Sequence, residues 1–511
     1  MNGTILTRAG KEPGRVHAPR HAPRQSRVWI TGTGAVLALA LLLQMSGTAR
    51  ASDDPQSDAY PLTDENITTA IENELLVDPS VRLDGIDVST KDGVVTLLGT
   101  APSLLAADRA VKIAMGTVGT RSVIDQLAVL RTLRTDSEIV NDVEGALLSD
   151  PATRSFTIEA KVDSGWVTLT GTVDSWAQKF LCGDVARGIA GVLDVDNNIE
   201  VDLTAHRDAS EIVDDITRSW RANVWIDDRQ LDVHVDDGTH VVVSGSVPSA
   251  LQKEMAVSVC WVAGVESVDA RAIQVRWEPG ALARDERPLT DEMIRAAVVH
   301  TFELDPRLGG LDIHVRVEKG VVVLRGIVDN LKARNSAALD ANNTKGVWQV
   351  KNYLRIRPAP PIDAQAIAGA VLSALARDPY LGSLDPTIEV NQGRVILSGA
   401  VYSEFEKARA ADLASRIIGV IDVVNLLDVR KEEPQASDWA ILRDVESELF
   451  WSPFVDASDV HVTVEGGVAT LTGSVKSWQA RNAATENAIQ GGARRVINKI
   501  DVPGSPLVSR Q

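Results

Sequence analysis

The sequence has few of the residues that build catalytic and metal sites. Its 511 residues include only two cysteines, Cys182 and Cys260, and eight histidines. Neither type shows the paired spacing of a zinc site, and nucleophile elbows, phosphate-binding loops and H-E-x-x-H runs are absent from the sequence. We therefore expect a protein that is not an enzyme, with no cofactor, no metal site and no small-molecule substrate.

Basic residues are also in short supply. The chain has 52 Lys and Arg against 70 Asp and Glu, a net charge of −18, and the first 51 residues hold seven of the basic residues but one acid. An acidic body repels phosphate backbones, so we do not expect nucleic acid as a partner. The same charge weighs against docking on anionic lipid by electrostatics alone.

Residues 1–51 resemble an export signal. A basic stretch precedes an apolar run centred on Ala35–Leu43, and small residues follow up to Ala49-Arg50-Ala51. The longer run Trp29–Met45 is nearly long enough to span a bilayer, so an uncleaved anchor in the inner membrane stays open beside a cleaved signal peptide. Both alternatives predict that the rest of the chain is exported to the periplasm.

One pattern returns six times along the rest of the chain. Three apolar residues spaced four apart, as on one face of a helix, are followed 32 or 33 positions later by a glycine. A fixed period indicates one supersecondary unit copied in tandem. The six glycines are Gly99, Gly171, Gly245, Gly326, Gly399 and Gly473.

The order of patterns within one period predicts an α-β-β-α-β unit. The first helix ends in four repeats at an Asp-Pro pair, as at Asp78-Pro79, because proline stops a helix. Two alternating strands joined at a glycine turn follow, then an Ala-rich helix capped at Gly-Val (Gly191-Val192), then a last strand. Two helices should cover one face of a three-stranded sheet. Period 2 places the repeat glycine on the buried face, where we expect it to let a helix backbone approach.

The sequences of the repeats resemble those of a known family. Val167–Val173 ("VTLTGTV"), Ala186 with Ile189, and Gly191–Val201 ("GVLDVDNNIEV") are similar to the BON domain, named for bacterial osmotic-stress and nodulation proteins. The resemblance implies an α+β tandem array of six small domains, each with two helices on one face of a three-stranded mixed sheet. Its boundaries define repeat 1 (63–131), repeat 2 (135–202), repeat 3 (208–276), repeat 4 (289–357), repeat 5 (362–430) and repeat 6 (437–502).

Repeat 3 departs most from the pattern, and one connection is long. Repeat 3 lacks Asp-Pro, has an extra residue in its hairpin (Asp236–His240) and has a shifted last strand. The linker 277–288 divides the array into two groups of three, and we expect it to act as a hinge between these halves.

Tryptophan is the best candidate for a binding role. The chain has 11 Trp against four Tyr and six Phe, and Trp176 and Trp478 stand at equivalent places five residues after the repeat glycine. Trp439 and Trp451 flank the first helix of repeat 6, and Arg494 and Arg495 form a local basic pair. These six residues are candidate membrane or partner contacts. Packing between neighbouring repeats is the alternative for the tryptophans.

The remaining polar residues have plainer interpretations. His314, His461 and His234 should lie on the outer face of the sheets, and acidic residues should lie on solvated helix faces. Export permits a disulfide, but we expect the two cysteines to be small buried apolar residues.

Two functions are compatible with the sequence. The resemblance implies a non-enzymatic exported cell-envelope protein that associates with phospholipid membrane surfaces through its BON domains in osmotic or envelope stress. The alternative is a periplasmic protein-interaction or holdase-like array that binds envelope proteins or exposed segments by avidity.

Overall fold

The computed structural model describes residues 62–81, 85–202, 207–277, 289–357, 362–430 and 437–503. The predicted signal or anchor, residues 1–51, and nearly all of the linker 277–288 lie outside these ranges. Within them, no helix is both long and apolar enough to cross a membrane.

Each repeat of the first half folds in the predicted order. Repeat 1 consists of α2 (Asp64–Val77), β1 (Ile86–Lys91), β2 (Val94–Ala101), α3 (Leu104–Gly116) and β3 (Ser122–Val129). Repeat 2 consists of α4 (Asp136–Ser149), β4 (Ile158–Asp163), β5 (Trp166–Val173), α5 (Trp176–Arg187), β6 (Asp194–Asn197) and β7 (Glu200–Val201). Repeat 3 consists of α6 (Ala209–Ala222), the 3-10 helix η2 (Asp228–Gln230), β8 (Leu231–Asp236), β9 (His240–Val247), α7 (Ala250–Ser258) and β10 (Ser267–Val275).

The second half repeats this order. Repeat 4 consists of α8 (Asp291–Leu304), β11 (Ile313–Glu318), β12 (Val321–Val328), α9 (Leu331–Asn342) and β13 (Gln349–Ile356). Repeat 5 consists of α10 (Ala364–Ala376), β14 (Thr387–Asn391), β15 (Arg394–Val401), α11 (Glu404–Ser415) and β16 (Asp422–Val429). Repeat 6 consists of α12 (Asp438–Trp451), the 3-10 helix η3 (Ala457–Asp459), β17 (Val460–Glu465), β18 (Val468–Gly473), α13 (Trp478–Gln490) and β19 (Arg495–Asn498).

The sheets confirm the predicted mixed topology. In every repeat the second strand is central, with the first strand antiparallel to it and the last strand parallel, as in the order β1-β2-β3. Repeat 3 differs where the sequence departs from the pattern: three residues separate β8 from β9, and the pairing of β10 with β9 shifts between Asp269 and Ala272.

An aspartate at the start of the first helix holds the hairpin turn. In repeat 1 the carboxylate of Asp64 accepts hydrogen bonds from the backbone N–H groups of Asp92 (2.7 Å) and Gly93 (2.9 Å). Both turn residues have positive φ, which suits a two-residue hairpin turn. The same pair of bonds recurs in repeats 2, 4 and 6, so one side chain fixes the helix against the hairpin.

The repeat glycines are needed for a different reason from the one predicted. A Cβ on Gly99 would lie 1.8 Å from the carbonyl oxygen of Gly85, just before β1, and Gly99 has φ +131°. The expectation that a helix backbone comes close is therefore wrong, because the first strand of the same sheet occupies that space. The Gly-Val cap is also misplaced, since α5 ends at Arg187 and Gly191 lies in the following turn with φ +90°.

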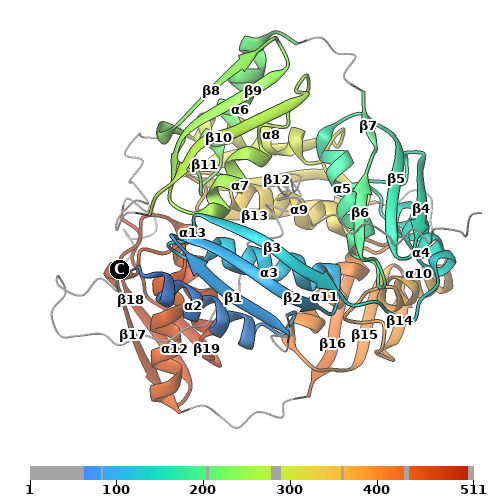
Figure 1. Cartoon of the computed structure of the whole chain (residues 1–511). Coiled ribbons are helices and arrows are strands. Elements are labelled where there is room, and N and C mark those ends of the chain that lie inside the picture. The colour runs from blue at the N-terminus through green and yellow to red at the C-terminus, as the bar shows by residue number, and fades with distance from the viewer. Residues whose placement is uncertain are drawn as a thin grey trace, which may run out of the picture.

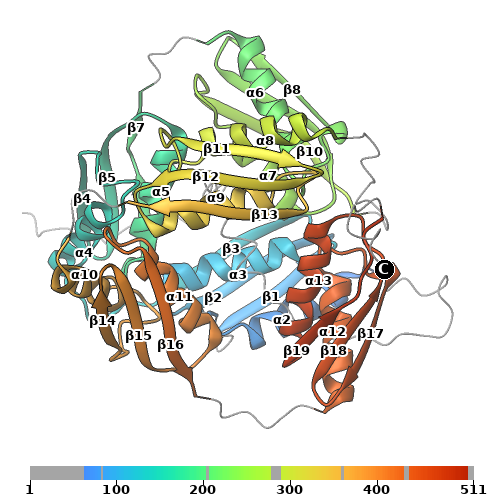
Figure 2. The ribbon, with the colours of Figure 1, turned by 180° about the vertical axis from the view of Figure 1, so that it is seen from behind.

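The six units pack into one body rather than a string. The helices gather toward the middle and the sheets face outward (Figures 1 and 2). The first helices meet in pairs between the two halves, repeat 3 with repeat 4, repeat 2 with repeat 5 and repeat 1 with repeat 6. In the first pair Ser219 Oγ lies 2.9 Å from His300 Nε2, and in the second Arg377 Nη2 donates to Ser149 Oγ at 2.9 Å.

Within each half, the start of one second helix contacts the loop before the last strand of a neighbouring repeat. The N–H of Ala250 in repeat 3 donates to Thr120 O in repeat 1 (3.3 Å). Leu104 of repeat 1 packs into the core of repeat 2, and Leu331 of repeat 4 into that of repeat 5. We call repeats 1–3 the first triad and repeats 4–6 the second triad; a hinge between them stays a prediction.

Candidate functional site

Two of the candidate tryptophans lie at contacts between repeats. Trp176 in repeat 2 donates from Nε1 to the carbonyl oxygen of Val265 in repeat 3 (2.8 Å), and its ring centroid lies 4.3 Å from that of Trp261. Trp478 in repeat 6 packs edge-on against Trp348 in repeat 4, with centroids 6.0 Å apart. The packing alternative describes both residues.

The two tryptophans of α12 have opposite environments. Trp451, at the end of the helix, is 6% exposed and packs in the core of repeat 1, where its carbonyl oxygen accepts from Val118 N. Trp439, at the start, is 68% exposed, and the Arg443 guanidinium lies 5.3 Å from its ring centroid. Of the four candidates, Trp439 is therefore the one available to a membrane or partner.

The candidate arginines begin at the same end of repeat 6 as Trp439. Asp438, which precedes Trp439, accepts from the N–H groups of Gly466 and Gly467, and Arg494 donates to the carbonyl oxygens of the same two glycines. The structure thus brings the start of α12 and the start of β19 together at one hairpin turn. We call the residues around and following this turn the repeat 6 patch; it comprises the exposed Trp439, Arg494, Arg495, Ile497 and Lys499 and the partly exposed Arg443.

The histidine and cysteine expectations are confirmed. His314, His461 and His234 are exposed on the sheets. Cys182 and Cys260 are free and buried in separate cores, and burial raises the pKa of the Cys182 thiol to about 12. Within the described residues, no group of His, Cys, Asp and Glu is arranged to hold a metal ion.

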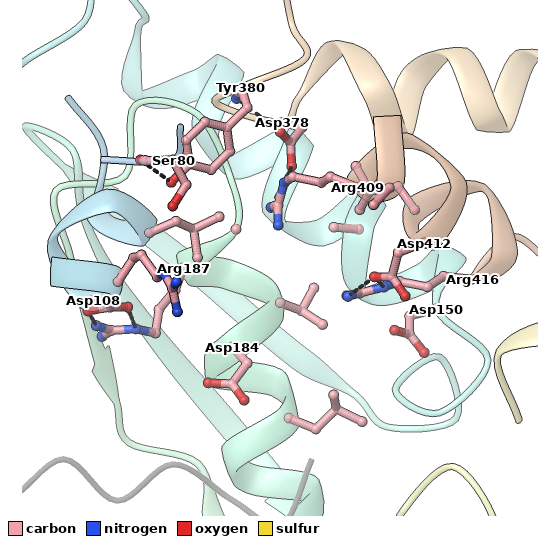
Figure 3. Close-up of a pocket in the computed structure, with 18 of the residues that line it drawn as sticks. Ser80, Asp108, Asp150, Asp184, Arg187, Asp378, Tyr380, Arg409, Asp412 and Arg416 are labelled. Atoms are coloured by element: carbon pink, nitrogen blue, oxygen red, sulfur yellow. Dashed lines mark hydrogen bonds and ion pairs between the residues drawn. The ribbon is translucent and has the colours of Figure 1, made fainter. Parts of the chain in front are cut away.

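The structure contains a central cavity that the sequence did not indicate. It has a volume of about 570 Å³, and its lining comes from repeats 1, 2, 4 and 5 together with Glu254 of repeat 3. Charged side chains of both signs line it among apolar ones (Figure 3). The cavity lies where the helices of the two triads meet, so its walls exist only in the packed array.

The aspartates of the Asp-Pro pairs lie in this wall, which corrects the expectation of solvated acids. Asp78 is buried and pairs with Arg109 at 2.7 Å. Asp378 is buried and pairs with Arg409 at 2.6 Å, as Figure 3 shows. Each arginine stands 31 residues after its aspartate, at the same repeat position. That spacing is the sequence signal that could have identified these buried ion pairs.

Further ion pairs join the repeats across the cavity. Arg187 of repeat 2 binds Asp108 of repeat 1, and Lys332 of repeat 4 binds Asp412 of repeat 5 at 2.6 Å. Burial would raise the pKa of Asp412, but Arg416 and Lys332 hold it below its ordinary value, so this carboxylate is ionised. Each of these pairs joins two repeats of the same triad, so charge pairing contributes to holding each triad together.

Repeats 1 and 6 meet at two carboxyl groups instead. Glu74 and Glu448 stand at equivalent positions, 25 residues before their repeat glycines, and both are buried. Burial raises the pKa of each well above its ordinary value, and for Glu448 the charge of Glu74 adds to the shift. These carboxyl groups favour the protonated, neutral form in the folded protein.

Comparison with known proteins agrees with this architecture. The BON domain profile matches residues 63–131, 135–202, 208–276, 290–358, 363–431 and 437–504. The chain is 31% identical over 146 residues to osmotically-inducible protein Y of Escherichia coli, covering 27% of this chain and 73% of that protein. It is 32% identical over 143 residues to the outer membrane lipoprotein DolP of Haemophilus influenzae (27% and 72%), and 26% identical over 145 residues to a 21 kDa hemolysin of Actinobacillus pleuropneumoniae (27% and 74%). From its six matched domains and the fold that they share, the chain belongs to the BON domain family.

Proposed function

We propose that this is a non-enzymatic envelope protein, exported to the periplasm, which associates with phospholipid membrane surfaces through repeat 6 and acts in osmotic or envelope stress. The stress and envelope parts are supported by the similarity to an osmotically-inducible protein and to an outer membrane lipoprotein. The membrane part is supported by one observation above all, the repeat 6 patch.

The patch has the composition of a membrane-interface contact. Trp439 is a large exposed aromatic residue, and Ile497 is an exposed apolar residue on β19 between Arg495 and Lys499. Tryptophan is favoured at headgroup depth because its ring is amphipathic, and arginine binds lipid phosphate. Two acids of α12 are already engaged, Asp438 with the turn amides and Asp444 with Arg443 at 2.9 Å.

Charge sets the expected lipid preference. A basic side chain near an anionic membrane contributes about 1 kcal/mol, and salt screens this contribution. The acidic remainder of the chain opposes a broad approach to the bilayer, so binding should use the patch alone and should weaken steeply with ionic strength. Removing Arg494 and Arg495 together should cost about 2 kcal/mol, roughly 30-fold in partitioning at low salt.

Vesicle co-sedimentation at low and physiological salt, with zwitterionic and with partly anionic vesicles, tests this proposal. Trp439→Leu and Arg494→Gln/Arg495→Gln should weaken binding. Trp166→Leu, at another exposed tryptophan, in repeat 2, and Arg295→Gln/Arg394→Gln, which removes two solvent-facing arginines elsewhere, should leave it unchanged.

Two outcomes would argue against membrane association. Failure of the folded protein to sediment with either vesicle type would refute membrane association. Suppression of a client protein's aggregation without lipid would then favour the interaction-array alternative.

A further inference from the structure

One ion pair in the central cavity is too long to include a hydrogen bond. Asp150 of repeat 2 and Arg307 of repeat 4 both line the cavity, and Arg307 Nη2 lies 4.0 Å from Asp150 Oδ2, beyond hydrogen-bonding distance. The two side chains are only 7% and 9% exposed. Among the residues that the structure describes, nothing hydrogen-bonds to Asp150 Oδ2 or to Arg307 Nε.

Burying a charged group without a hydrogen-bond partner costs free energy. A buried charged group that lacks hydrogen bonds loses its hydration without compensation. The other oxygen of the Asp150 carboxylate, Oδ1, already accepts a hydrogen bond from Ala152 N at 3.0 Å. Thus Asp150 Oδ2 and Arg307 Nε are buried beside an opposite charge but have no hydrogen-bond partner among the described residues.

Several of the other charges on the wall form ion pairs. Asp412 binds Arg416 and Lys332, and Asp108 binds Arg187. Lys112, Asp184 and Asp305 also line the cavity, so charges of both signs remain on its wall beside Asp150 and Arg307. An anion would satisfy Arg307 alone and a cation Asp150 alone, whereas a molecule with both charges satisfies both.

Apolar side chains surround this pair. Leu181, Val185 and Ile189 of repeat 2 line the cavity, as do Leu413 and Ile417 of repeat 5. They offer a ligand apolar surface beside its charged groups, within a volume that accommodates a small molecule. We propose that the central cavity binds a small zwitterionic solute of the amino-acid type, with its carboxylate on Arg307, its ammonium on Asp150 and a short apolar side chain against this wall.

This site would couple the two triads. Asp150 belongs to the first triad and Arg307 to the second, so a ligand between them adds contacts that exist only while the triads are packed. A ligand that binds only the packed state stabilises it in proportion to its occupancy. The inference does not depend on membrane association, and it revises the expectation that the protein has no small-molecule ligand.

Calorimetric titration of the purified full chain with four related probes provides the test. L-leucine carries both charges, N-acetyl-L-leucine only the carboxylate, L-leucinamide only the ammonium, and N-acetyl-L-leucinamide neither. We expect saturable binding of L-leucine with a rise in thermal midpoint, and at least tenfold weaker binding of each of the other three. Absence of leucine binding, or equal binding of all four probes, would overturn the proposal.

Variants locate the site. Asp150→Asn keeps the oxygen that accepts from Ala152 N, and Arg307→Gln removes the guanidinium; each should weaken leucine binding at least tenfold. Arg295→Gln is the matched control in repeat 4, since its partner Glu292 lies on the exposed side of α8. Unchanged leucine affinity in both cavity variants, or an equal loss in the control, would show that the ligand binds elsewhere.

Discussion

Trp451 offers a direct way to test whether repeats 1 and 6 are energetically coupled. This residue ends the first helix of repeat 6, yet its indole ring packs in the core of repeat 1 and is 6% exposed. Truncating a buried tryptophan to alanine costs about 3–5 kcal/mol through lost burial and the cavity left behind. Because the contacts lie across the interface, Trp451→Ala should reduce the stability of repeat 1 as well as that of repeat 6.

Trp439→Ala is the control that separates the loss of stability in Trp451→Ala from a general effect of removing a tryptophan. Trp439→Ala removes the same side chain from the other end of α12, where it is 68% exposed, and should cost within about 0.5 kcal/mol. Both variants keep the helix, since alanine has the highest helix propensity.

Hydrogen exchange read separately for each repeat is the appropriate assay. In Trp451→Ala, amides of α2, β1 and β2 should exchange faster, by a factor that corresponds to a loss of several kcal/mol, and in Trp439→Ala they should not change. If the Trp451→Ala variant accelerates exchange in repeat 6 while repeat 1 keeps its protection, the two repeats are not coupled and the reasoning fails.

Three further outcomes follow from the described contacts. Gly171→Ala should destabilise repeat 2 by more than about 2 kcal/mol in urea unfolding, because the new Cβ would lie 2.5 Å from Thr157 O at φ +144°. Gly399→Ala should cost less, because the atom nearest to its new Cβ, Pro386 Cα, is 3.5 Å away. Glu448 binds a proton in the folded protein that the unfolded chain releases, so the free energy of unfolding should fall as pH rises above about 4.5; Glu448→Gln should flatten this decline, and an unchanged slope in denaturation from pH 5 to 9 would argue against it. Asp136→Ala removes two hydrogen bonds to the Ser164 and Gly165 amides, so it should cost about 1–2 kcal/mol and speed exchange at those amides, and normal protection there would contradict the role assigned to Asp136.

The sequence predicts the unit well because the unit is specified locally. Helical stripes such as Ile67, Ile71 and Leu75, alternating strands and turn glycines all act within about 70 residues, and all appear in the structure where expected. The repeat glycine shows the limit of this reasoning. Its place on the inner face was predictable. The identity of the approaching backbone was not, because it depends on the carbonyl group just before the first strand, whose position periodicity does not encode.

The arrangement of the repeats could not be predicted in the same way. It depends on contacts between residues hundreds of positions apart, such as Tyr380 Oη donating to Ser80 O and Gln479 Nε2 to Asn342 O. A tryptophan at an element end suits a membrane and an interface between repeats equally well, so Trp176 and Trp439 were indistinguishable in the sequence. The buried Asp78 was likewise hidden, because an Asp-Pro pair already has a sufficient explanation as a helix stop.

The cavity, the covered tryptophans and the isolation of the repeat 6 patch all depend on the packing of the six BON domains into one body. Small-angle X-ray scattering of residues 52–511 tests this most directly. A compact chain of this length has a radius of gyration of about 23 Å, whereas a string of six separate domains has roughly twice that value. We predict a value near the first, with a single maximum in the distance distribution. A value of about 40 Å or more, with maxima at the spacing of separate domains, would contradict the account.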